Sequence, residues 1–276
     1  MLNLFRRLVI KNQVPVAIPL LNRYGFKATF NVVTGWGPNW SSFKQAAQNG
    51  HEIASHTVSH VGYASDNELR QSKQTIEQNI GQECVTIAYP NCQASSQNDL
   101  RKYYIAGRVC SNQLVSDNIY DYYGISSLIC GSTGLNSAQQ LNQKAQQAKQ
   151  MGQWAIYLIH GVDNDGGYSP ISSSTLDSHF NYVKSDGRFW VATFKSVVKY
   201  ILEAKNLVVT QNGNSISVSC NYQTSLTKLD QPVTLAKQYS GAAPTVTSSN
   251  GQRVNSWTYN GKIVFDVIPG QSYTIQ

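Results

Sequence analysis

Three of the five histidines of this chain lie within ten residues, in the stretch HEIASHTVSH at positions 51–60. His51 and His56 do not fit the zinc-binding pattern H-E-x-x-H, because they are five positions apart and lie on different sides of a helix. His56 and His60 are four apart, which places both imidazoles on one side of a helical turn. We therefore predict that His56 and His60 bind one divalent ion, with zinc as the expected metal. The alternative is a pair of ordinary structural histidines, the role that we predict for His51 and His179.

Two other segments carry groups that could move a proton or stabilise a charge. His160 ends the apolar run AIYLIH and, with Asp163 and Asp165 close behind it, can act as a general acid. The segment AYPNC at 88–92 runs from a predicted strand into a proline turn, which can present a backbone N–H to a developing oxyanion. The structural alternatives are that His160 caps a strand and that Pro90 ends one.

The elements that must position these residues alternate between strand and helix from residue 14 to about 205. Such alternation predicts an α/β fold with a parallel sheet or barrel, whose functional residues lie at the carboxyl ends of the strands. Strands are predicted at 27–33, 85–90 and 154–160, and helices at 16–26, 41–50, 66–81, 136–152 and 172–187. The helix at 41–50 is expected to have a serine cap, and that at 136–152 to bury Leu141, Ala145, Ala148 and Met151.

The pattern changes after residue 205. Alternating strand segments follow, interrupted by Asn212-Gly213 and Asn260-Gly261, which are strong hairpin signals. We predict two domains, an α/β domain at 1–205 and a small antiparallel β domain, sandwich-like, at 206–276. The second domain is either a structural appendage or a carbohydrate-binding module that uses Trp257 and Tyr259.

Composition and charge exclude several classes of protein. The chain has 276 residues, 41% hydrophobic and only 13% charged, as expected of a folded protein rather than a disordered one. The net charge is +7, but Lys and Arg are scattered, so no nucleic-acid partner is predicted. No apolar run is long enough to span a membrane, and no signal peptide is visible. The five cysteines contain no C-x-x-C pair, although Cys84, Cys92 and Cys110 are close enough in sequence to form a disulfide.

Taken together, these motifs resemble the NodB-type polysaccharide deacetylases of carbohydrate esterase family 4. The resemblance runs from about residue 4 to 203 and rests on the order H-[ST]-x-x-H followed by a strand-end L-x-H. The segments that carry it are NRYGFKATFNVV, NGHEIASHTVSH, AYPNC, YYIAGRVC, LIH and FWVATFKSVVKYI.

The resemblance implies a distorted (β/α) barrel that hydrolyses N- or O-acetyl groups of chitin-like, peptidoglycan or acetylxylan chains with a divalent metal. By this resemblance His56 and His60 would be metal ligands, Tyr89 would supply the oxyanion N–H, and His160 would protonate the leaving group. The metal would lower the pKa of its bound water and polarise the carbonyl. The family's polymeric substrates, together with the cysteines, imply a secreted protein, and we expect a monomer.

Substrate contacts are also predicted. Pro90 belongs to the turn that would face the acetyl group. The loop WGPNW brings Trp36 and Trp40 to positions where their rings could stack on sugars, although tryptophans in such a loop are as often buried in the core.

One part of the family pattern is absent. The family's first motif, Phe-Asp-Asp-Gly, supplies the base and a metal ligand, but this chain has Phe5-Arg6-Arg7 there. A guanidinium about 4 Å from a divalent ion would be repelled by roughly 8 kcal/mol at an effective dielectric constant of 20. Three hypotheses follow: an enzyme completed by Asp99, Asp163 or Asp165; an inactive relative that binds carbohydrate; or a shifted reading frame, since Phe-Asp-Asp codons read one base early give Arg-Arg.

Overall fold

The computed structural model describes residues 2–3, 12–163, 165–239 and 244–276, which form two compact units, Met1–Val197 and Val198–Gln276. The boundary between the units lies eight residues before the predicted boundary at 205, which is the last residue of helix α7 (Phe194–Lys205). Arg6 and Arg7 lie outside the described residues. No helix in the described part of the chain has the length and apolarity needed to cross a membrane.

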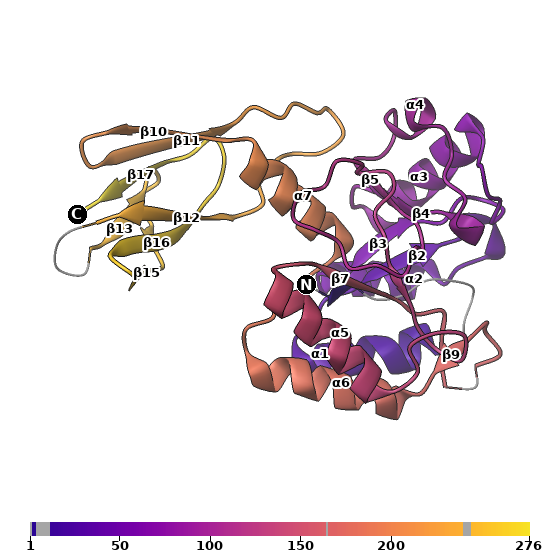
Figure 1. Ribbon diagram of the computed structural model, residues 1–276. Coiled ribbons are helices and arrows are strands. Elements are labelled where there is room, and N and C mark those ends of the chain that lie inside the picture. Colours follow the sequence, from indigo (N-terminus) through magenta and orange to yellow (C-terminus); the bar gives the residue numbers. More distant parts are fainter. Residues whose placement is uncertain (1, 4–11, 164, 240–243) are drawn as a thin grey trace. The chain divides into compact units, whose positions relative to one another are not determined.

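Seven short parallel strands form the centre of the first unit (Figure 1). One sheet has the order β2-β3-β4-β5 and a second has the order β1-β7-β6. A parallel bridge from Arg108 at the end of β5 to Ile125 connects the first sheet with the segment that leads into β6. The bounds are β1 (Leu2–Asn3), β2 (Thr29–Val32), β3 (Glu52–Ser55), β4 (Thr86–Ala88), β5 (Ala106–Arg108), β6 (Leu128–Ile129) and β7 (Ala155–Leu158).

The predicted parallel α/β architecture is therefore confirmed. All residues of β3, β4 and β7 are buried, as expected of parallel strands that are covered on both faces. The strands follow the order of a barrel that would close between β1 and β2. No pairing between those two strands is present among the described residues, so closure of the barrel stays a prediction.

Helices connect these strands and cover them. Helices α1, α5 and α6 pack together, since Tyr24 of α1 donates a hydrogen bond to Asp177 of α6, and Asn142 of α5 contacts His179 of α6 (Figure 1). The bounds are η1 (Gln13–Ala17), α1 (Ile18–Tyr24), η2 (Thr34–Trp36), α2 (Trp40–Gln48), α3 (Asp66–Ile80), η3 (Pro90–Cys92), α4 (Gln97–Leu100), α5 (Ala138–Met151) and α6 (Ser173–Asp186), with short strands β8 (Gly161–Val162) and β9 (Pro170–Ile171) before α6.

Two details of these helices differ from the sequence prediction. Helix α2 begins earlier than expected, and its cap is Asn39, whose side chain accepts a hydrogen bond from the Ser42 N–H. The prediction of a serine cap was wrong because Trp40 and Ser41 already belong to the helix. In α5 the first three predicted core positions are buried, but Met151 is 64% exposed because it occupies the last turn, beyond the covering helix face.

The second unit contains two antiparallel sheets that share one apolar core. Its strands are β10 (Leu207–Asn212), β11 (Ser215–Cys220), β12 (Val233–Gln238), β13 (Val246–Ser248), β14 (Arg253–Val254), β15 (Ser256–Tyr259), β16 (Lys262–Val267) and β17 (Ser272–Ile275). The sheet orders are β10-β11-β17-β13-β14 and β12-β16-β15. Side chains from both sheets, among them Ile216, Phe265 and Tyr273, are buried together. The predicted antiparallel, sandwich-like domain is therefore present.

Both predicted hairpins are also present. Asn260 and Gly261 join β15 to β16 with positive φ angles of 49° and 70°, the conformation of a type I′ turn. In the other hairpin Asn212 pairs with Ser215, so the turn is Gly213-Asn214, one residue later than the Asn-Gly signal.

Candidate functional site

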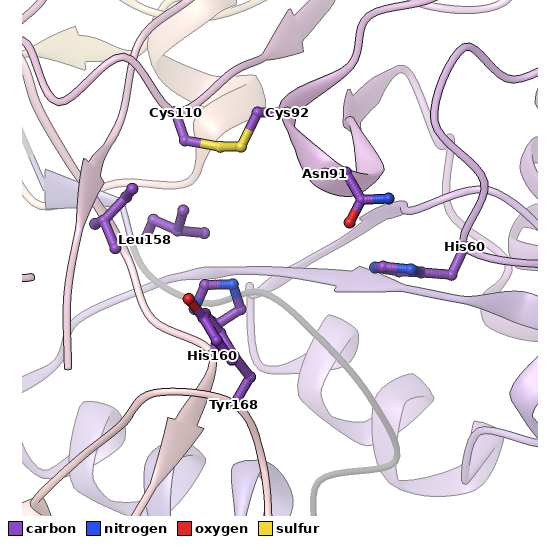
Figure 2. Close-up of a pocket in the computed structure, with 8 residues that line it drawn as sticks. His60, Asn91, Cys92, Cys110, Leu158, His160 and Tyr168 are labelled. Carbon is purple, nitrogen blue, oxygen red and sulfur yellow. A yellow bond between two sulfur atoms is a disulfide. The ribbon is translucent and has the colours of Figure 1, made fainter. Parts of the chain in front are cut away.

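A cavity of about 290 Å³ lies at the carboxyl ends of the parallel strands of the first unit. This is the position that the α/β pattern predicted for functional residues. Figure 2 shows the disulfide and Leu158 on one side of the cavity, Asn91 and His60 on another, and His160 with Tyr168 below. The cavity is lined by His60, Asn91, Cys92, Cys110, Ile129, Leu158, His160 and Tyr168.

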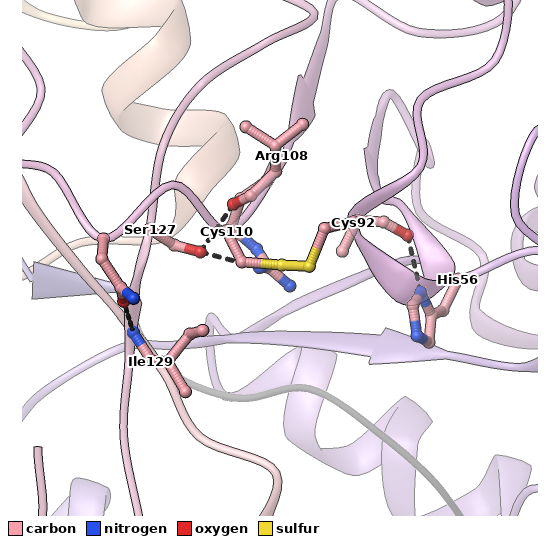
Figure 3. The surroundings of a disulfide bond; sticks show 9 residues. His56, Cys92, Arg108, Cys110, Ser127 and Ile129 are labelled. Carbon is pink, nitrogen blue, oxygen red and sulfur yellow. Dashed lines mark hydrogen bonds between the residues drawn. A yellow bond between two sulfur atoms is a disulfide. The ribbon is translucent and has the colours of Figure 1, made fainter. Parts of the chain in front are cut away.

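His56 and His60 come together as predicted, but not on a helical turn. They follow β3 in a loop in which Thr57 and His60 have positive φ angles of 66° and 62°. Their ring centroids are 4.8 Å apart and the rings are nearly perpendicular. His56 Nδ1 lies 2.6 Å from the carbonyl oxygen of Ala88 in β4, which leaves Nε2 as the ring atom suited to a metal (Figure 3).

Glu68, in the first turn of α3, holds this histidine loop in place. Its carboxylate accepts hydrogen bonds from the N–H groups of Val58 and Ser59 at 2.8 and 3.1 Å, and from the Ser59 hydroxyl. Glu68 therefore stabilises a strained loop conformation and does not line the cavity.

Trp36 stacks on His60, with ring centroids 5.0 Å apart and an interplanar angle of 25°. Trp40 begins α2 and packs against the hydrophobic core. Neither tryptophan lines the described cavity, so their predicted role in stacking on sugars stays a prediction. The geometry gives Trp36 an evident role in orienting the His60 ring.

His160 lies two residues beyond β7 and is 6% exposed. Tyr168 packs edge-on against it, with ring centroids 5.0 Å apart, and is itself 52% exposed at the cavity. Asp165 accepts hydrogen bonds from the N–H groups of Val162 and Gly167. Asp163 accepts one from the Ser173 N–H at the start of α6. These two carboxylates therefore shape the loop that follows His160.

The proline turn does not present the N–H that the resemblance assigned to it. The Tyr89 N–H donates to the carbonyl oxygen of Arg108 at 3.2 Å, which extends the β4–β5 ladder. The Tyr89 side chain is 1% exposed and lies across Gly107, where no other residue would leave room for its hydroxyl. Asn91, two residues later, lines the cavity (Figure 2). Asn91 is thus the better candidate, and Pro90 is buried beside it.

The residues present do not complete the three-ligand metal site that the resemblance implies. Within the described ranges no three His, Cys, Asp or Glu side chains are grouped so as to hold an ion. Residues 1, 4–11, 164 and 240–243 contain none of these residue types. Asp99, the third substitute carboxylate considered, lies in α4 and accepts a hydrogen bond from Lys102. The hypothesis that a substitute carboxylate completes the site is therefore not supported.

A buried positive charge lies next to the cavity. Arg108 is 5% exposed, and its guanidinium donates one hydrogen bond to Ser127 Oγ at 3.0 Å (Figure 3). Its second terminal nitrogen has no partner in the described part of the chain. Burial lowers the pKa of Arg108 to about 9, because a buried cation without a counter-ion is costly.

Comparison with known proteins agrees with this description. The family model for polysaccharide deacetylases matches residues 9–104, a segment that includes both histidines of the loop and the proline turn. The match begins after Arg6 and Arg7. A gellan lyase from Bacillus sp. is 26% identical over 250 residues, which cover 78% of this chain and 10% of that protein. The chain thus spans about a tenth of the length of this relative.

Two solved structures align with much of this chain. A protein from Mycobacterium smegmatis assigned as a polysaccharide deacetylase aligns with a TM-score of 0.53 and 15% identity, covering 69% of this chain and 77% of that one. A family 4 pseudoenzyme from Bacillus anthracis aligns with a TM-score of 0.47 and 18% identity, covering 72% of this chain and 65% of that one. The predicted relationship to NodB-type polysaccharide deacetylases is confirmed by the family match, and the shared fold by the first of these structures.

Proposed function

We propose that this relative of the polysaccharide deacetylases binds an acetylated polysaccharide in the cavity beside His60 and His160. We further propose that hydrolysis of the acetyl group needs a carboxylate at the positions of Arg6 and Arg7. The observation that carries the proposal is the convergence of His60, His160 and Asn91 on one cavity at the carboxyl ends of the parallel strands.

The cavity suits an acetyl group. Leu158 and Ile129 supply an apolar wall that could accept the methyl group, while Asn91 could donate its N–H to the carbonyl oxygen. Tyr168 is half exposed at the cavity, where its ring could contact a sugar face. These features support recognition of an acetylated sugar.

Hydrolysis is the second candidate function, and it is the reaction of the family that the chain resembles. In that reaction His160 would donate a proton to the leaving oxygen or nitrogen, and the Asn91 N–H would stabilise the oxyanion. A divalent ion, when bound, would activate water. His56 and His60 supply only two ligands, so the chain as written is expected to bind zinc weakly.

Secretion is part of the proposal, since polymeric substrates of this kind are extracellular. The Cys92–Cys110 disulfide supports it, because structural disulfides persist in oxidising compartments. The second unit could also bind carbohydrate, because Trp257 and Tyr259 are 51% and 65% exposed on β15.

The test compares the chain as written with an Arg6→Asp, Arg7→Asp variant. Calorimetry measures binding of zinc and of acetylated xylan and chitin oligomers, and a parallel assay measures acetate release. A matched control, Lys228→Asp with Arg253→Asp, makes the same charge change at exposed positions of the second unit. We expect the parent and both variants to bind oligomers. Only the Arg6→Asp, Arg7→Asp variant should bind zinc tightly and release acetate.

Tyr168→Ala reports on the cavity itself. It should weaken oligomer binding about tenfold, the equivalent of roughly 1.4 kcal/mol. Tyr120→Ala is the control, because Tyr120 is 89% exposed and does not line the cavity, and it should leave oligomer binding unchanged. Acetate release by the chain as written would refute the need for a new carboxylate, and absence of oligomer binding would refute the proposal as a whole. Resequencing the source DNA across codons 5–7 tests the shifted frame.

A further inference from the structure

The disulfide between Cys92 and Cys110 forms part of the cavity wall. It joins η3, the turn that carries Asn91, to the segment just after β5, and the two Cα atoms are 5.6 Å apart (Figure 3). Both cysteines line the same cavity as His60 and His160. The bond therefore connects the oxyanion side of the cavity to the neighbouring strand of the sheet.

The turn that this bond anchors has an unfavourable backbone conformation. Asn91 and Cys92 are consecutive left-handed residues, with φ angles of 53° and 62°. Asparagine tolerates this region, but most other residues with a Cβ avoid it because Cβ crowds the following carbonyl. Cys92 therefore keeps this conformation only because its surroundings determine it. Two local hydrogen bonds close the turn, from the Cys92 N–H to Tyr89 O and from the Gln93 N–H to Pro90 O.

The turn also supports the loop that carries His60. The Tyr63 N–H donates to the carbonyl oxygen of Gln93 at 3.2 Å. The Gln93 side chain lies against Gly62 so closely that no Cβ could be placed there. A shift of the η3 turn would therefore be transmitted to the segment 60–63, in which His60 and Tyr63 are themselves left-handed.

We propose that the Cys92–Cys110 disulfide is a positioning element, which holds the left-handed turn so that Asn91 faces the cavity and the His60 loop stays supported. This inference rests on the proposed binding of an acetyl carbonyl at Asn91. The alternative role is general stabilisation, in which the cross-link acts by restricting the unfolded chain over a sequence separation of 18 residues.

Two variants without the disulfide separate these roles. The double-alanine variant, Cys92→Ala with Cys110→Ala, removes the bond and leaves a residue with Cβ in the left-handed position. The glycine variant, Cys92→Gly with Cys110→Ala, removes the same bond, but glycine adopts the left-handed conformation without the steric cost. A general cross-link would be lost equally in both variants, and glycine would lower stability further by increasing the freedom of the unfolded chain.

The first measurement is binding of acetylated oligomers by calorimetry. We expect the double-alanine variant to lose about tenfold in affinity and the glycine variant to stay within about threefold of the parent, although the glycine variant melts no higher. Cys220→Ala, which changes a free cysteine in the second unit, is the matched control and should leave affinity unchanged. Equal affinity for the parent and both variants, or equal losses in both, would overturn the positioning role.

The second measurement does not depend on ligand binding, so it separates a failure of this inference from a failure of the proposed function. Hydrogen exchange is followed by mass spectrometry for the parent and the double-alanine variant. We expect faster exchange in peptides covering 90–93 and 60–63, and unchanged exchange in peptides covering 206–276. If exchange at 90–93 and 60–63 is the same in both proteins, the disulfide does not position the turn, whatever the cavity binds.

Discussion

The two units of this protein differ in where they tolerate strain. Of the nine described residues other than glycine with positive φ, eight lie in the first unit, and Thr57, His60, Tyr63, Asn91 and Cys92 all belong to the two segments beside the cavity. The second unit has one, Asn260, in an ordinary hairpin turn. Strained backbone persists where surrounding contacts enforce it, and it concentrates at functional sites. The comparison therefore indicates that the functional site lies in the first unit.

Burial also shifts the pKa of groups in both units, with opposite consequences for stability between pH 5 and 8. In the first unit, His51 and His179 are buried and uncharged: burial, with a smaller contribution from Lys27, lowers the pKa of His51 to about 4, and burial lowers the pKa of His179 to about 3. In the second, burial raises the pKa of Glu203 in α7 to about 7. Both histidines have hydrogen-bonded structural roles, as the sequence predicted.

The largest expected effect is an opposite response of the two units to pH. Folding lowers the pKa of His51 and of His179, so the free energy of unfolding of the first unit should decrease as pH falls below about 6.5. The decrease at pH 5 is on the order of 2 kcal/mol for each histidine. Glu203 is the reverse case, so its unit loses stability as pH rises from about 4.5 to 7. Calorimetric scans at pH 5 and 8 should show two transitions that move in opposite directions. Two transitions that move together would contradict the comparison.

The next effect isolates Glu203. Its Oε1 accepts a hydrogen bond from the Gln231 N–H at 3.1 Å, and its other oxygen has no partner among the described residues. Glu203→Gln keeps the acceptor and removes the charge. The variant should therefore be more stable than the parent at pH 8, by about 2 kcal/mol, and similar to it at pH 5.

Asp266→Asn, at an exposed position of β16, is the control for this change. Urea unfolding of the second unit, followed by fluorescence of Trp257, measures both. An equal gain at both pH values would show that Glu203 is not the source of the pH dependence.

The smallest effect concerns the two tryptophans. Trp36→Leu removes the ring stacked on His60 and should cost about 1 kcal/mol of stability in the first unit. It should also shift the His60 ring signals in a proton NMR spectrum, because the aromatic ring current disappears. Trp40→Leu, whose side chain packs on the core instead, should lower stability without shifting those signals. A shift in the Trp40 variant alone would reverse the roles of the two side chains.

Local patterns in the sequence were enough to predict much of this protein. Helical and strand periodicity places α1, α3, α5 and α6 and the strands β2, β4 and β7, because each pattern repeats within one element. The Asn-Gly pairs indicate hairpins because both residues tolerate positive φ. The pairing of His56 with His60, and the place of His160 at the end of a strand, were visible for the same reason. Whether these histidines belong to a complete metal site was not visible, since a third ligand would have to come from elsewhere in the chain.

Only the tertiary structure decided which groups face the cavity. The sequence contains Tyr89 and Asn91 in one short motif, but the Tyr89 N–H extends the pairing of β4 with β5, while Asn91 lines the cavity. Similarly, three cysteines could have paired, and the strand order brings Cys92 to Cys110 while Cys84 stays buried and free. Both outcomes depend on contacts between distant segments, whose register no local pattern records. The sequence by itself determined which elements form and which residues could react, and the packing of the strands determined which of those residues meet.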